Sequence, residues 1–197
     1  MITEVGGAPV YVWRAGSPWL ALSSGVLGGG LGERSWVVNA TVPDDYGRLD
    51  PDRHVGEIAD ALGLTGEGVG LLTAVDVREV VHREDGGVRV AVTTGVGAHP
   101  TWAAGPAAVP EEVGTINAVC WLPVRLTDAA LVNAVATVAE AKAQALFEAN
   151  VPGTGTPTDS VVVLCPTTGP LEPFGGPRSV VGGALARAVH SAIRARL

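Results

Sequence analysis

Short apolar runs, rich in valine and separated by Gly, Pro and Asp, fill the first 125 residues of the chain. Runs of this length with β-branched residues and turn residues between them are typical of β-strands. The predicted strands cover residues 10–15, 18–24, 35–42, 70–77, 78–84, 88–96 and 115–124. Because the links between them are short, antiparallel neighbours are favoured.

The apolar pattern takes the period of a helix in three places. The predicted helices cover residues 50–62, 127–150 and about 179–197. In the first of them, Val55, Ile58 and Leu62 are spaced to form one buried face. Thr127 is a suitable N-terminal cap for the second. One more strand is expected at 160–166, between the second and third helices.

This order of elements predicts a fold of the α/β class with an α+β-like arrangement. We expect a single-domain layered sandwich with a mixed, partly antiparallel sheet and about three helices. The length of 197 residues suits one domain over residues 1–197. The Gly-, Pro- and Ala-rich segment 97–112 is the longest predicted loop, and it is either a lid over a ligand or a plain connection.

Charge and composition narrow the class of function. The net charge of -7 argues against a nucleic-acid partner, since such binding depends on clustered Lys and Arg. No apolar run is long enough to span a membrane. Glu4 precedes the first apolar stretch and no basic residue does, which argues against a secretory signal, so a cytoplasmic location is expected. Cys120 and Cys165 lie in apolar runs and are expected to be small buried hydrophobes.

Lys142 is the only lysine among thirteen basic residues. On a regular helix it falls within an apolar stripe, whereas Glu140 projects to the opposite side. The stripe consists of Leu131, Val135, Val138, Ala145 and Leu146. A lysine there either extends its ammonium to water over apolar neighbours or supplies a compact cation, or an amine, to a site.

The loop after this helix, residues 153–159, carries three hydroxyls, a carboxylate and two glycines. Hydroxyls can bind, orient or attack a ligand, and glycines allow backbone N–H groups to approach it. Asp159 could orient a base, activate water or pair with Lys142. The alternative is an ordinary turn in which Thr and Asp side chains bond their own backbone. The sequence leaves both interpretations open.

Two glycine-rich segments and the four histidines give weaker indications of function. The glycine-rich segment 28–33 departs from the dinucleotide-binding fingerprint at its last position, which is Glu33. Residues 175–183 suit either an anion at a helix N-terminus or close helix packing. The four histidines have no metal-ligand spacing, so no metal is expected.

Eight segments in order along the chain resemble the adenosylcobinamide amidohydrolases, enzymes of corrinoid salvage. They are Ser23-Ser24 with Gly28–Gly30, NATVPDDY from Asn39, GLLTAVDV from Gly70, VTTGV from Val92, GTIN from Gly114, EAKAQAL from Glu140, TGTPTD from Thr154 and GGPRSVVG from Gly175. The chain departs from the family pattern at Leu72, where methionine is expected, and at Gly97-Ala98, where the expected Asn is missing. The missing Asn puts one polar contact in doubt.

The resemblance implies hydrolysis of the amide that joins a propionate side chain of the corrin ring to aminopropanol, in adenosylcobinamide or its phosphate, to give adenosylcobyric acid. The corrinoid would be the substrate, and no cofactor is expected. The catalytic candidates are Lys142, Asp159, Thr154, Thr156 and Thr158, and Ser24 is an alternative nucleophile. The candidate substrate contacts are Ser23, Ser24, Gly29, Gly30, Asn39, Thr73, Asn117, Gly155 and Ser179.

Two other functions fit the same residues. A non-catalytic corrinoid-binding module would keep the glycine-rich cleft without needing Lys142 or Asp159. An amidohydrolase or acyltransferase could use the same groups on a different small amide. In each case the expected partner is a small molecule, with neither nucleic acid nor membrane, and assembly into a homo-oligomer is left open.

Overall fold

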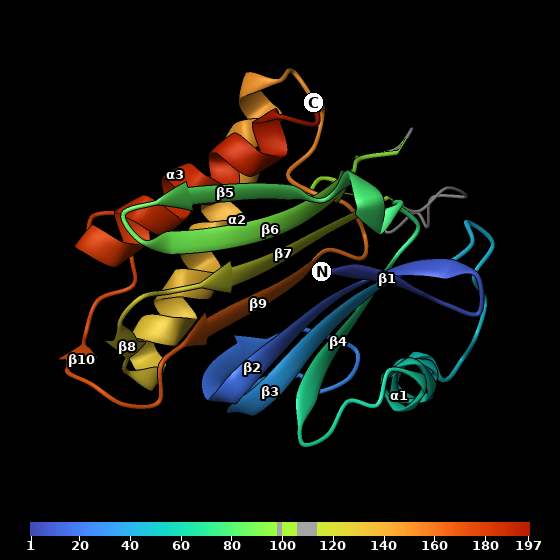
Figure 1. Cartoon of the computed structure of the whole chain (residues 1–197). Coiled ribbons are helices and arrows are strands. Elements are labelled where there is room, and N and C mark those ends of the chain that lie inside the picture. Colours follow the sequence, from blue (N-terminus) through green and yellow to red (C-terminus); the bar gives the residue numbers. More distant parts are fainter. Residues whose placement is uncertain (98–99, 106–113) are drawn as a thin grey trace.

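A mixed sheet of eight strands organises the molecule, whose computed structural model describes residues 1–97, 100–105 and 114–197 (Figure 1). The strands are β1 (Ile2–Val5), β2 (Ala8–Ser23), β3 (Gly30–Thr41), β4 (Gly68–Thr73), β5 (Val81–Asp85), β6 (Val88–Gly95), β7 (Thr115–Trp121) and β9 (Ser160–Cys165). They lie in the order β4-β3-β2-β9-β7-β6-β5, and β1 pairs with β2. Two short strands, β8 (Arg125–Leu126) and β10 (Leu171–Glu172), form a separate parallel pair.

Most neighbouring strands of the large sheet are antiparallel, and two pairs are parallel, β3 with β4 and β7 with β9. The predicted mixed, partly antiparallel sheet is therefore confirmed. Parallel strands begin at the same end of a sheet. The start of β7 consequently lies beside the start of β9, although more than forty positions separate them in the sequence: Asn117 of β7 pairs with Ser160 of β9.

Three α-helices lie on the sheet in the described parts of the chain, as predicted: α1 (Pro51–Ala61), α2 (Asp128–Glu148) and α3 (Val180–Arg194). Thr127 accepts a hydrogen bond from the Ala130 N–H and so caps α2 as expected. Helices α2 and α3 pack together on one face of β6, β7 and β9, whereas α1 packs against β3 and β4 at the other end of the sheet (Figure 1). The protein is an open α+β sandwich, the fold class that the sequence predicts.

Alternation along β7 divides the core into two sides. Ile116, Ala118 and Cys120 face α2 and α3, and the intervening Val119 and Trp121 face the other side. Both cysteines are buried as expected, and burial raises the pKa of each thiol. Neither thiol is thus placed to act as a thiolate nucleophile.

The side of the sheet away from α2 and α3 is concave. Trp13 of β2 lies 5.6 Å, ring centre to ring centre, from Trp121 of β7, although β9 separates the two strands in the sheet. The register of β2 against β3 shifts between Arg14 and Trp19, and such irregularities increase local twist. This curvature brings residues of β3 near residues of β6 and β7.

The structure corrects several predicted boundaries. The strands predicted at 10–15 and 18–24 are one continuous strand, β2, because the irregularity at Gly16 and Pro18 bends it without ending it. The strand predicted at 70–77 ends at Thr73 and is followed by a short 3₁₀ helix, η1 (Val77–Glu79), capped by Asp76. Of the predicted loop 97–112, residues 98–99 and 106–112 lie outside the described residues, and with them the departure at Ala98.

Among the described residues, no helix combines the length and the apolar character needed to cross a bilayer.

Candidate functional site

Lys142 and Asp159 form an ion pair between α2 and the residue that precedes β9. Both side chains are largely buried, with exposed fractions of 19% and 14%. Lys142 lies in the predicted apolar stripe beside Val138, and Glu140 is exposed on another side of the helix, as predicted. The single lysine is therefore a paired cation inside the molecule and does not extend into solvent.

The carboxylate of Asp159 connects three parts of the structure. One oxygen accepts hydrogen bonds from the Ile116 N–H (2.8 Å) and the Thr156 hydroxyl, and the other accepts from the Thr156 N–H (3.0 Å) and Lys142. Asp159 thus ties the start of β7, the loop 153–159 and α2 to one another.

Gly155 borders the ion pair. A Cβ atom at this position would overlap both the Asp159 carboxylate and the Lys142 ammonium, so a side chain here would displace at least one of the two groups. Gly155 is one of the predicted substrate contacts. In the structure its nearest side chains are the two ionic groups themselves.

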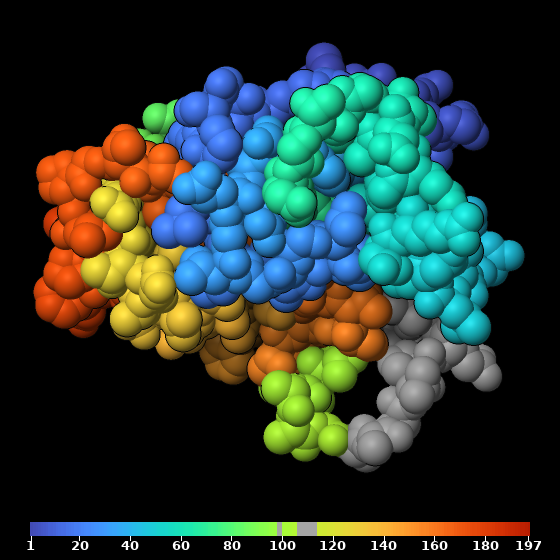
Figure 2. All heavy atoms as spheres, turned by 90° about the horizontal axis from the view of Figure 1, so that it is seen from below, coloured from blue at the N-terminus to red at the C-terminus, as the bar shows by residue number. Residues whose placement is uncertain are grey.

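The two outer threonines of the loop bond to neighbouring backbone. Thr154 accepts from the Ala103 N–H (3.0 Å), and the loop pairs with Thr101 through the Gly155 carbonyl (2.8 Å). Residues 100–105 accordingly lie beside the chain that leads into β9, where they project from the surface in light green (Figure 2). The Thr158 hydroxyl bonds the Gly114 carbonyl (2.9 Å) and the Thr115 hydroxyl (2.7 Å). Among the three candidate hydroxyls, only that of Thr156 contacts the ion pair.

A cavity of about 170 Å³ opens beside Lys142 and Asp159. Apart from these two residues and Ser160, its lining is apolar. Its larger apolar side chains come from β7, α2, β9 and α3 and are Ile116, Val135, Val138, Val161 and Ile193. A polar pair at the edge of a small apolar cavity suits a ligand that combines a polar reacting group with a short hydrocarbon part.

A second polar group lies on the opposite side of β7. The Asn117 amide donates to the Asn39 side-chain oxygen (3.0 Å) and to the Leu72 carbonyl (2.9 Å), and the Asn39 amide donates to the Thr93 hydroxyl (3.1 Å). These side chains are almost completely buried. The Asn117 side-chain oxygen has no hydrogen-bond partner among the described residues. Because Asn117 directly follows Ile116, this network and the ion pair are adjacent along the strand but face opposite sides of it.

The remaining predicted contacts lie at different distances from the pair. Ser24 is close to it, since its hydroxyl accepts from the Val161 N–H (3.0 Å) at the start of β9. Ser23 and Thr73 accept from the backbone N–H groups of Gly25 (2.9 Å) and Val75 (3.1 Å) and so shape their own turns.

Gly29 ends the connection between β2 and β3, and Gly30 is the first residue of β3. Gly30 has a positive φ of 85°, and a side chain on Gly29 would overlap the Gly25 carbonyl. The conformation of this turn alone therefore explains why glycine occupies both positions.

Ser179 lies away from this group. It caps α3 by accepting from the Gly182 N–H (3.0 Å), and the nearby Gly175 packs against Ala130 in the first turn of α2. At a rise of about 1.5 Å per residue, Lys142 is about 18 Å further along α2 than Ala130. The close contact at Gly175 agrees with the packing interpretation of the glycine-rich segment 175–183.

Two contributors to the site have no distinctive signal in the sequence. The Ile116 N–H, which bonds Asp159, belongs to an apolar residue, and Thr93 has the same sequence context as an ordinary strand threonine.

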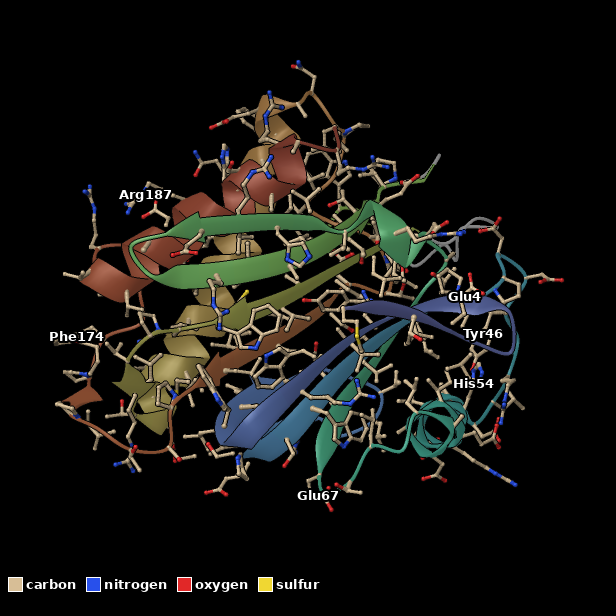
Figure 3. All side chains as sticks on the ribbon, viewed as in Figure 1. Glu4, Tyr46, His54, Glu67, Phe174 and Arg187 are labelled. Carbon is tan, nitrogen blue, oxygen red and sulfur yellow. The ribbon has the colours of Figure 1, made fainter. Side chains whose placement is uncertain are left out.

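Tyr46, in the segment NATVPDDY, bonds His54 (2.9 Å) of α1, where the two side chains lie together (Figure 3). In the described part of the chain, no group of three or more His, Cys, Asp or Glu side chains is arranged to hold a metal ion.

Comparison with known proteins gives one consistent result. The family model described as adenosylcobinamide amidohydrolase matches residues 2–197. A protein of that name from Methanosarcina mazei is 31% identical over 186 residues, which cover 90% of this chain and 89% of the relative. Another of that name, from Halobacterium salinarum, is 35% identical over 201 residues, which cover 92% of this chain and 80% of the relative.

Proposed function

Because the chain belongs to the adenosylcobinamide amidohydrolase family, we propose that it hydrolyses the aminopropanol amide of adenosylcobinamide. The products would be adenosylcobyric acid and free aminopropanol, and the reaction would return a salvaged corrinoid to cobamide synthesis. The buried Lys142–Asp159 pair beside an apolar cavity is the observation on which we assign the reaction to particular residues.

Amide hydrolysis requires an attacking oxygen, a group that accepts its proton and donors for the developing oxyanion. Lys142 uses one ammonium proton on Asp159 and makes no hydrogen bond to any other described residue. Its remaining protons are free to donate to the substrate carbonyl oxygen. The contacts therefore favour Lys142 as the electrostatic partner of the reaction and Asp159 as the group that orients it.

Four donors already occupy the oxygens of Asp159, so a water molecule can reach this carboxylate only if one of these hydrogen bonds gives way. The attacking oxygen is then either the Thr156 hydroxyl, which already donates to Asp159, or a water molecule held near the pair. In both routes Asp159 accepts the proton of the attacking oxygen and returns it to the leaving amine. Thr156→Val separates these routes, because it removes the hydroxyl and keeps the side-chain shape. Complete loss of turnover supports attack by Thr156, and partial retention supports water.

The first experiment incubates the purified protein with adenosylcobinamide, with and without a chelator, and follows adenosylcobyric acid by chromatography and mass. We expect product in both samples. No product, together with a spectral shift of the corrinoid on mixing, would instead support a binding module. Hydrolysis of other amides in a substrate panel, with adenosylcobinamide left intact, would support the second alternative.

Lys142→Arg tests the assignment of the ion pair. Arginine keeps the charge but replaces the compact ammonium, which lies close to Gly155, by a broad planar group with a different donor geometry. We expect a loss of about 100- to 1,000-fold in turnover, the usual cost of losing one oxyanion donor. Glu140→Gln, two residues away and exposed on the same helix, is the control and should keep its activity. Full activity in Lys142→Arg would remove lysine chemistry from the mechanism.

A further inference from the structure

We infer that the cavity beside Lys142 and Asp159 receives the amine half of the scissile amide and selects its hydrocarbon part. This inference rests on the proposed function, because it assigns a side of the substrate to a side of the site. It concerns the short carbon chain of the amino alcohol and its methyl branch. The residues that would contact this part are Val135, Val138 and Ile193.

The size of the cavity decides which half of the substrate enters. Its volume of about 170 Å³ is smaller than that of pockets for drug-sized ligands, which start near 300 Å³. A corrin macrocycle is far too large, whereas a three-carbon amino alcohol fits. With the amide at Lys142 and Asp159, the macrocycle remains outside and the amine points inward.

The chemistry of the walls agrees with this orientation. Val135 and Val138 of α2 and Ile193 of α3 present branched aliphatic surfaces, and no arginine or histidine of the described chain lines the cavity. Such walls gain free energy from burial of a methyl group and offer little to a strongly charged one. The ammonium of Lys142 and the carboxylate of Asp159 lie where the polar amide would be held.

The test compares two substrates that differ by this methyl group: adenosylcobinamide and its analogue made with aminoethanol. One missing carbon in an apolar pocket costs about 10- to 200-fold in kcat/KM. We therefore expect the wild-type protein to prefer the aminopropanol substrate by at least tenfold. Free aminopropanol should likewise inhibit more strongly than free aminoethanol.

Ala139→Leu fills the cavity from its edge. Ala139 lines the cavity and is exposed on α2, so a leucine there keeps the helix and reduces the free volume. We expect kcat/KM for adenosylcobinamide to fall at least tenfold and that for the smaller aminoethanol analogue to fall less. Ala129→Leu, exposed near the start of the same helix and outside the cavity, is the matched control and should leave both values unchanged. Thermal melting of both variants checks that they fold.

The outcomes separate the two proposals. Equal kcat/KM for the two substrates, with Ala139→Leu reducing both equally, would overturn the amine subsite and leave the proposed function standing. Failure to hydrolyse either substrate would overturn both. A preference for the aminopropanol substrate that Ala139→Leu weakens would establish the subsite.

Discussion

Gly155 leaves the space in which Lys142 and Asp159 meet. Any side chain there would overlap both ionic groups, so at least one of them would have to shift and the geometry of the ion pair would change. We expect Gly155→Ala to lower turnover at least tenfold while the protein stays folded. The measurement is a kcat determination beside a circular dichroism spectrum. Gly176→Ala, where an added Cβ meets nothing within 4 Å, should behave as wild type; equal activity in the two variants would contradict the arrangement.

Asp159 has a structural role as well as an orienting one. In Asp159→Asn, one side-chain oxygen becomes an amide donor that faces existing donors, and the partly buried Lys142 loses its counterion. Leaving buried groups unpaired costs about 1–3 kcal/mol. We therefore expect a lower free energy of unfolding in urea together with a loss of turnover. If Asp159→Asn lost turnover with unchanged stability, the carboxylate would act in catalysis alone.

At this scale the sequence predicts the site in part. The single lysine on an apolar stripe and the carboxylate at the end of the following loop make a Lys142–Asp159 pair one of the arrangements that the sequence leaves open, and the structure contains this pair. The role of Gly155 and of the Ile116 N–H could not be predicted, because it depends on the distance between backbone segments that are far apart in the sequence. Residue type carries no information about such distances.

At the scale of elements, β5 is an edge strand of the sheet, and a bidentate ion pair joins it to α3. Arg187, labelled in Figure 3, projects from α3. It donates to both oxygens of Asp85, at 2.6 and 2.8 Å, and these hydrogen bonds hold the pKa of the Asp85 carboxyl below its ordinary value of 3.8. A carboxyl with a lowered pKa stabilises the fold above that ordinary value, and the stabilisation disappears as the pH falls through the folded-state pKa.

Asp85→Asn should consequently lower the melting temperature slightly at neutral pH, by no more than about 3 °C, since exposed ion pairs contribute little. The difference from wild type should shrink as the pH is lowered past 3.8, because the wild-type carboxyl then becomes protonated. Melting curves measured over a pH series check this. The exposed Asp44→Asn is the control, and a pH-independent difference for Asp85→Asn would show that the ion pair is not its cause.

The elements themselves are predicted well where the periodic pattern is long and uninterrupted. The 21-residue helix α2 follows its apolar stripe, and β6, β7 and β9 coincide with continuous apolar runs. Prediction fails at β2, because Gly16 and Pro18 interrupt the pattern of a strand whose pairing with β3 nevertheless continues. Such continuity depends on the partner strand, which the local sequence does not reveal.

At the scale of the whole molecule, the buried Asn39–Thr93–Asn117 network closes the concave side of the sheet. Its members come from β3, β6 and β7, and two other strands lie between β3 and β7 in the sheet. No periodic pattern predicts this contact, because it results from the curvature of the whole sheet. The buried network also gives Asn39 and Asn117 a structural role that is separate from the substrate contacts expected of them.

Asn117→Leu distinguishes these roles. It removes the donor to the Asn39 oxygen and to the Leu72 carbonyl, and each buried acceptor left unpaired costs about 1–3 kcal/mol. In a protein of this size, each kcal/mol lowers the melting temperature by about 2–4 °C. We therefore expect a fall of at least about 4 °C without ligand, whereas Asn133→Leu, exposed on α2, should change it little. A raised KM with an unchanged melting temperature would mean that Asn117 serves the ligand and not the closure of the sheet.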